Sequence, residues 1–185
     1  ATGYDADFSE ERILMSYNKE LAGGLGNLLN RSLNMANRYR GGVVRRGDFD
    51  DEICAALRQT TSGARAAYCE KMASWAIHQG IEEAWKIVTV ANGFIEVTQP
   101  FKLAKDESQS ARLDAVLHHL AEALAHVSVL LDPIMPVMCA RIREQLGWVL
   151  PAGFTLDDLK WGLLPDGHQL GTGTPLFPRV ELAAE

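Results

Sequence analysis

The chain has 185 residues with 18 basic and 24 acidic side chains, a formal net charge of −6, and 47% of its residues are hydrophobic. A chain of this length and composition buries enough apolar surface to fold as one globular domain, which excludes intrinsic disorder and small disulfide-stapled scaffolds. The three cysteines form no C-x-x-C pair and the longest apolar stretch, 115–131, contains three histidines and a glutamate. We therefore expect free thiols, no membrane span and a cytoplasmic protein.

Apolar residues spaced three and four apart predict an all-helical body from Ser9 to about Gly147. Ser9 is the expected N-cap of the first helix, because two glutamates follow it in the first turn, where carboxylates favour the positive end of the helix dipole. Glycines at positions 23, 24 and 26 weaken the middle of this segment, so we expect a kink or a short break there. The next segment should end at the glycine pair 41–42.

Two further helices are predicted in the middle of the chain. The first runs from about Asp50 to Trp75, with a weak point at residues 60–63. The second is marked by apolar residues between 81 and 95 and must stop before Pro100, because the residue before a proline disfavours the helical conformation.

A row of mostly leucine side chains from Leu113 to Leu131 alternates steps of four and three. This is the seam of antiparallel helix packing. Pro133 and Pro136 separate this helix from a shorter one that ends near Gly147. The patterns together predict an all-α bundle of about five or six helices.

We assign residues 1–147 to this bundle and residues 148–185 to a C-terminal tail. The tail is rich in proline and glycine and is expected to be irregular. It has room for one short hairpin, whose returning strand would include residues from Leu176 to Glu181.

Three polar residues on the leucine-rich helix, His119, Glu122 and His126, share one helix face, which is a spacing seen in metal and acid–base clusters. Measured against the leucine seam, they fall at positions that face solvent. Residues 119 and 126 are also two turns apart, about 10 Å, which is too far for one zinc ion. We therefore expect neither a metal nor a catalytic residue here.

The most informative feature is a stretch without Asp, Glu or Lys from residue 21 to residue 47, which carries five arginines in an otherwise acidic protein. Within it Asn27, Arg31, Asn34 and Arg38 step by four, three and four beside an apolar row. Their forked donors, with no carboxylate expected nearby to neutralise them, suit base edges and phosphates. A site for carboxylate substrates and a merely solvated helix face are the alternative interpretations.

A second candidate follows the helix that stops before Pro100. Phe101 lies between this proline and Lys102, with Lys105 one turn further on. An exposed aromatic ring here would stack on an unpaired base while the lysines meet phosphates. The alternative is a helix-ending proline followed by a core phenylalanine.

These motifs resemble, in their order and spacing, the anticodon-binding domain of the methionyl-tRNA synthetases, which are class I aminoacyl-tRNA synthetases. The resemblance covers nearly the whole chain. It rests on Leu25-Gly26-Asn27-Leu28 with Arg31, on Pro100 through Lys105, on Trp161-Gly162-Leu163 and on Leu176 through Glu181.

The resemblance implies a helix bundle that follows a catalytic domain and reads the CAU anticodon of methionine tRNAs. By the match of motifs, Asn27 and Arg31 contact anticodon bases, and Phe101, where the family usually has Trp, stacks on one. Neighbouring or phosphate contacts are expected from Pro100, Asn34, Arg38, Arg45, Arg46, Lys102 and Lys105.

The chain contains neither of the family's ATP-site signatures, H-x-G-H and K-M-S-K-S. The resemblance therefore implies no catalytic residue, metal or cofactor in this segment, and it places ATP with magnesium, and the zinc-binding knuckle, in a catalytic half outside the chain. The expected partners are methionine tRNA and that catalytic domain of the same polypeptide; neither DNA nor a membrane is expected. The tail is expected to pack back either on the bundle or on that catalytic domain. The alternative function is a free-standing RNA-binding or protein-interaction module without synthetase activity.

Overall fold

The computed structural model describes residues 9–47 and 49–181. Helix α1 (Glu10–Ser16) begins at the predicted N-cap, where the Ser9 side chain accepts a hydrogen bond from the backbone N–H of Arg12 at 3.3 Å. It runs without interruption into η1 (Tyr17–Gly26) and α2 (Asn27–Arg40). α2 ends at Gly41, which adopts the left-handed conformation (φ 61°) that glycine tolerates best. The predicted end of this segment is confirmed.

The glycine cluster has a different effect from the one expected. The chain does not break there, because η1 is a π-helix, a wider turn that is usually short and is often found at functional sites. A Cβ atom on Gly23 would lie 3.1 Å from the carbonyl oxygen of Asn18, and one on Gly26 would lie 3.2 Å from that of Leu21. The glycines therefore permit the wider turn.

Five more α-helices complete the bundle within the described residues. α3 (Glu52–Ala73) starts at its N-cap Asp51 and continues straight through the expected weak point at 60–63. α4 (Ile77–Thr98) stops before Pro100 as predicted. The remaining elements are the short α5 (Pro100–Leu103), the 3-10 turn η2 (Glu107–Gln109), α6 (Ser110–Leu130) and α7 (Pro136–Gln145). The all-α prediction is confirmed, and none of the described helices is long and apolar enough to cross a membrane.

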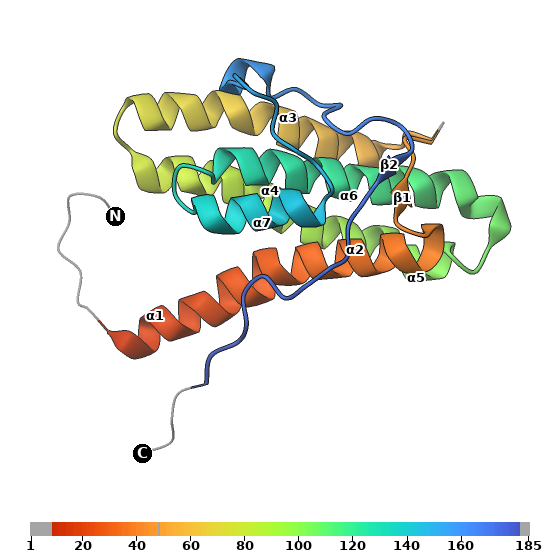
Figure 1. Cartoon of the computed structure of the whole chain (residues 1–185), viewed down its shortest axis with the longest axis horizontal. Coiled ribbons are helices and arrows are strands. Elements are labelled where there is room, and N and C mark those ends of the chain that lie inside the picture. Colours follow the sequence, from red (N-terminus) through yellow and green to blue (C-terminus); the bar gives the residue numbers. More distant parts are fainter. Residues whose placement is uncertain (1–8, 48, 182–185) are drawn as a thin grey trace.

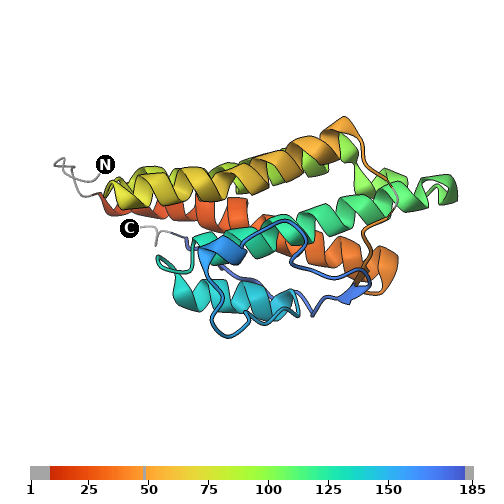
Figure 2. The same cartoon turned by 90° about the horizontal axis from the view of Figure 1, so that it is seen from above.

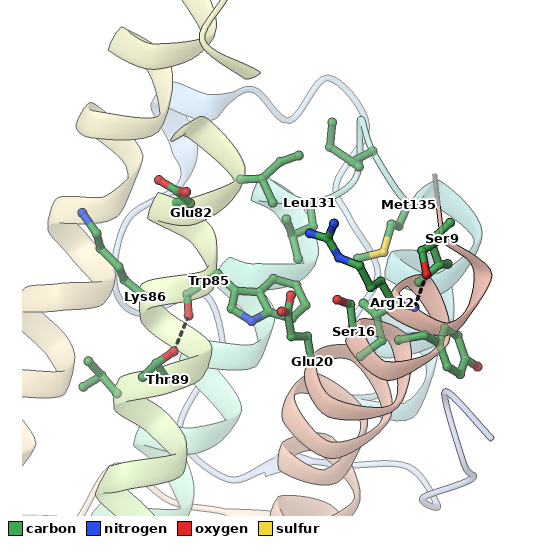
Figure 3. A pocket seen from close by; sticks show the side chains of 16 residues that line it. Ser9, Arg12, Ser16, Glu20, Glu82, Trp85, Lys86, Thr89, Leu131 and Met135 are labelled. Atoms are coloured by element: carbon green, nitrogen blue, oxygen red, sulfur yellow. Dashed lines mark hydrogen bonds between the residues drawn. The ribbon is translucent and has the colours of Figure 1, made fainter. Parts of the chain in front are cut away.

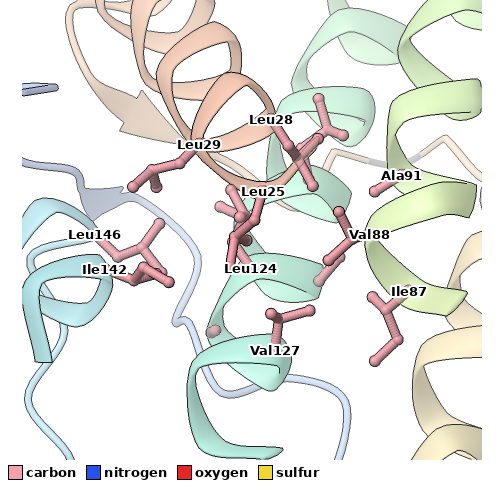
Figure 4. Packing of buried hydrophobic residues seen from close by; sticks show 14 of the residues in the cluster. Leu25, Leu28, Leu29, Ile87, Val88, Ala91, Leu124, Val127, Ile142 and Leu146 are labelled. Carbon is pink, nitrogen blue, oxygen red and sulfur yellow. The ribbon is translucent and has the colours of Figure 1, made fainter. Parts of the chain in front are cut away.

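α6 lies at the centre of the molecule, with α2, α3, α4 and α7 around it (Figures 1 and 2). Its side chains are buried almost without exception from Leu113 to Leu130. Figure 4 shows Leu124 and Val127 of α6 packed among Leu25, Val88 and Ile142, which come from three other helices. The leucine seam is thus only one part of the buried surface of this helix.

The tail is irregular apart from a 3-10 turn, η3 (Leu156–Asp158), and one two-residue strand. That strand, β2 (His168–Gln169), pairs antiparallel with β1 (Val43–Val44), in the segment after α2. The predicted hairpin is therefore wrong: residues 176–181 form no strand. Side chains bind this part of the tail instead, since Asn18 exchanges two hydrogen bonds with the backbone of Val180 at 2.7 and 3.1 Å.

Candidate nucleic-acid interface

α2 presents an exposed face of amide side chains. Asn27, Asn30 and Asn34 are all exposed, and the side-chain amide N–H of Asn34 donates to the side-chain oxygen Oδ1 of Asn30 at 3.1 Å. The stripe predicted from the sequence is therefore present, and Asn30 belongs to it although the pattern of fours and threes passed over this residue. Arg38 is exposed at the end of the stripe, with its guanidinium 5.8 Å from the centre of the Tyr39 ring.

Arg31 lies at the edge of this face, beside α4. One of its guanidinium nitrogens is 2.7 Å from a carboxylate oxygen of Glu96, and the two side chains are 33% and 66% exposed. The expectation that no carboxylate lies nearby is wrong, because it considered only neighbours in the sequence, and Glu96 comes from another helix. Only one of the five N–H donors of the guanidinium is in this contact, so others remain for a ligand.

α5 places the second candidate group at the same end of the bundle as Glu96, because it directly follows α4. Pro100 is buried at the first position of α5, whereas Phe101 is 44% exposed and Lys102 and Lys105 are exposed. The alternative of a core phenylalanine is thus wrong. The Arg31–Glu96 contact joins the amide face of α2 to this end of α4, so both candidate groups lie on connected surface.

The other arginines of the basic stretch are arranged differently. Arg40 is bound to Asp114 and to Ser110 of α6. Arg46 faces the tail, where its backbone N–H donates to Asp166 at 2.8 Å, whereas Arg45 is exposed. The structure therefore brings Arg31 and Arg38 to the α2 face and directs Arg46 away from it.

The histidine cluster of α6 is buried, and the prediction that it faces solvent is wrong. The Glu122 carboxylate accepts backbone hydrogen bonds from Gly162, Leu163 and Leu164 at 3.1, 3.2 and 2.6 Å. Trp161 packs against the rings of His119 and His126. The tail thus covers the polar side of α6, which the leucine seam leaves uncovered.

Burial sets the ionisation of these groups. It raises the pKa of Glu122, an effect that the three backbone N–H groups oppose, and it lowers the pKa of both His118 and His126 to about 4. Among the described residues no cluster of three or more His, Cys, Asp or Glu side chains is arranged to hold a metal ion. The cluster fastens the tail to the bundle.

Two hollows flank the α1–η1–α2 segment, and no sequence pattern indicated either of them. The larger, about 1070 Å³, is a mainly apolar groove between α1, α4 and the turn after α6. Figure 3 shows Trp85 and Arg12 pointing into it, with Leu131 and Met135 on its far wall. The smaller, about 310 Å³, lies between η1, the start of α2 and the tail, and Asn27 lines it.

Comparison with known proteins gives a consistent result. No protein-family model matches the chain. The methionine–tRNA ligase of Caldanaerobacter subterraneus subsp. tengcongensis is 37% identical over 183 residues, and that of Enterococcus faecalis is 36% identical over 189. Each match covers 99% of this chain and 28% of the relative, so the chain spans little more than a quarter of the length of these relatives.

Solved structures agree with the sequence comparison. The apo form of Mycobacterium tuberculosis methionyl-tRNA synthetase matches with a TM-score of 0.89 at 30% identity, over 97% of this chain and 36% of that chain. The complex of the same enzyme with methionyl-adenylate matches with a TM-score of 0.86, over 93% of this chain and 34% of that chain.

These matches relate the helical bundle to the aminoacyl-tRNA synthetases. More particularly, the chain is homologous to a segment of the methionyl-tRNA synthetases, as the sequence resemblance predicted.

Proposed function

We propose that this chain recognises the CAU anticodon loop of methionine tRNAs as part of a methionyl-tRNA synthetase, an enzyme that attaches methionine to its tRNA using ATP. The observation that carries the proposal is the position of Arg31, partly exposed between the amide stripe of α2 and the end of α4 that leads to Phe101. Asn27 and Arg31 present donors and an acceptor to base edges. Phe101 offers an exposed ring for stacking, and Lys102 and Lys105 lie beside it for phosphates.

Glu96 gives the Arg31 site a definite geometry. The ion pair holds the guanidinium on one side, and because Arg31 is partly exposed and Glu96 is exposed, a base can compete with the carboxylate for it. A carboxylate at this position also repels misplaced phosphates, so it favours the approach of a base edge over that of the backbone.

The chemical step belongs, in this proposal, to a catalytic half outside the chain, where ATP and magnesium act. The apolar groove in Figure 3 supports a contact with that half, because it combines exposed hydrophobic side chains such as Ile13 and Ile134 with the charged rim formed by Arg12 and Glu82. It lies where α1 begins and α6 ends, whereas α5 lies at the opposite end of the bundle (Figures 1 and 2).

The test is a titration of the chain with an RNA hairpin that carries a CAU loop, and with a hairpin changed at one of these bases, at two salt concentrations. We expect a preference for CAU of more than about tenfold, about 1.4 kcal/mol, which Arg31→Ala removes. Arg141→Ala is the matched control, because Arg141 is an exposed arginine on α7 away from both candidate groups. Equal and steeply salt-dependent binding of both hairpins would contradict the proposal.

A further inference from the structure

The smaller hollow, between η1, α2 and the tail, has the composition of a ligand site. Two amide side chains of α2, Asn27 and Asn30, line it from one side, and Phe177 and Arg179 line it from the tail. No carboxylate is among the described residues that line it. Its volume of about 310 Å³ is at the lower end of the range of small-molecule pockets, roughly 300–1000 Å³.

The wall formed by the tail is held in place on both sides of Arg179. Val180 exchanges two hydrogen bonds with Asn18, and the carbonyl oxygen of Pro178 accepts one from the Tyr17 hydroxyl at 3.0 Å. The Tyr17 ring also meets Phe177 edge-on, with ring centres 6.2 Å apart. Because the backbone is already fixed, a ligand would have to order only the Arg179 side chain.

The π-helix shapes the opposite wall. A Cβ atom on Gly26 would lie 3.4 Å from a ring carbon of Phe177, so the absence of a side chain lets the tail approach closely. Gly23, which also lines the hollow, carries no side chain that would fill it. The wide turn and its glycines therefore leave room between the helix and the tail.

Arg179 is an exposed cation with no ion-pair partner among the described residues. The hollow thus offers a guanidinium without a partner, two amides and an aromatic ring, and no carboxylate of the described residues lines it. These groups complement a ligand in which an anionic group is attached to a flat hydrogen-bonding ring. That combination is a nucleotide. The hollow also shares Asn27 with the face that leads to Arg31, so a single RNA strand can cross α2 from one site to the other.

We propose that this hollow binds one unpaired nucleotide next to the CAU bases, with Arg179 on its phosphate and Asn30 on its base edge. The inference rests on the proposed function, because it takes the same RNA loop as its ligand. It makes the tail a part of the RNA-binding surface in addition to its packing role. The competing occupant is a protein surface, such as that of the catalytic half.

The first experiment titrates the CAU hairpin and its single-base variant against Arg179→Ala, Arg31→Ala and the control Arg141→Ala. We expect Arg179→Ala to weaken the binding of both hairpins about tenfold, as the loss of one charge-assisted contact should, and to reduce the salt dependence. The preference for CAU should remain, because Arg179 meets a phosphate and not an anticodon base. The thermal unfolding midpoint should not change, because the side chain is exposed.

The second experiment uses hairpins in which one loop nucleotide outside CAU at a time lacks its base. One such hairpin should bind the wild-type chain more weakly, and this loss should disappear in Asn30→Ala, since the two changes remove the same contact. The inference is overturned if Arg179→Ala and Arg141→Ala bind RNA equally well while Arg31→Ala loses the CAU preference. In that case the proposed function stands, and the result indicates a protein as the occupant of the hollow. If the wild-type chain shows no CAU preference, the proposed function fails and this inference fails with it.

Discussion

A carboxylate oxygen of Glu96 lies 2.7 Å from a guanidinium nitrogen of Arg31, although the two residues are 65 positions apart in the sequence. The contact joins α2 to the last turns of α4 at the surface that we assign to RNA. It makes Arg31 a held donor and not a freely moving charge.

Glu96→Gln should therefore bind both the CAU hairpin and its single-base variant about two- to fivefold more tightly, because a charge that repels phosphates is removed. The gain in affinity should be larger for the single-base variant of the hairpin than for the CAU hairpin, because Arg31 is held less firmly in Glu96→Gln. The preference for CAU should therefore shrink. Titration at fixed salt measures both effects. Glu83→Gln is the matched control, because Glu83 is also on α4 and pairs with Lys86 at 2.7 Å; the same change in both variants would refute a specific role for Glu96.

Phe101 should contribute to RNA binding and not to stability, because its ring is 44% exposed. Phe101→Ala should weaken binding of the CAU hairpin by about 1–3 kcal/mol, the usual contribution of one stacked base. Phe101→Leu, which keeps an apolar side chain without a π-face, should lose nearly as much, and Phe101→Trp should bind at least as tightly as the wild type. Calorimetric titration decides this, and a Leu variant that binds like wild type would rule out stacking.

Stability should fall as the pH drops from 7 to 5, because of the histidines beneath the tail. In the folded chain the pKa of His118 and of His126 is about 4, against an unfolded value of 6.5, so the unfolded state binds more protons between these two pH values. Each histidine then removes about 1.4 kcal/mol of unfolding free energy per pH unit below 6.5. The raised pKa of Glu122 opposes part of this loss at the acidic end.

Urea unfolding at several pH values measures this slope. His118→Asn should reduce it by about one proton, the contribution of one histidine. Nearby charges also shift the pKa values of His118 and His119, and these charges remain in that variant. They belong to Arg46, Asp166, Arg58, Asp50 and Asp51. An unchanged slope in His118→Asn would show that this histidine is not the source.

The apolar groove predicts a separation between RNA binding and catalysis. Ile13→Glu puts a charge on a groove side chain that is 52% exposed, so it should leave hairpin binding and thermal stability unchanged while it lowers aminoacylation by the parent enzyme. Val149→Glu is the control, because Val149 is 84% exposed and does not line the groove. Equal aminoacylation by both variants would argue against docking of the catalytic half in the groove.

Local sequence signals predicted the helix ends well. Ser9, Gly41 and Pro100 each act through their own backbone or side chain, so their effect does not depend on distant parts of the chain. The amide stripe of α2 also follows from a pattern within one segment, whereas the pattern around Phe101 left open whether this ring is exposed or part of the core.

Several features that sequence reasoning did not provide depend on contacts between distant segments. The sequence pattern of α6 predicts that its polar face is exposed to solvent. In the structure, irregular chain at 162–164 covers this face and donates three backbone N–H groups to Glu122. The pairing of β1 with β2 and the position of Glu96 beside Arg31 likewise join remote residues. Periodicity within one helix carries no information about such partners.

The π-helical turn between α1 and α2 also fixes an angle. Each residue of the wider π-helical turn rotates the chain around the helix axis by a smaller angle than a residue of an α-helix does. The length of η1 therefore sets the angle between two surfaces of this helix. One is the side of α1 that faces the apolar groove, and the other is the side of α2 that carries the amides. Removing one residue from η1 would rotate one surface against the other without altering a side chain of either. The spacing of this single continuous helix therefore sets the orientation of the groove relative to the amide face.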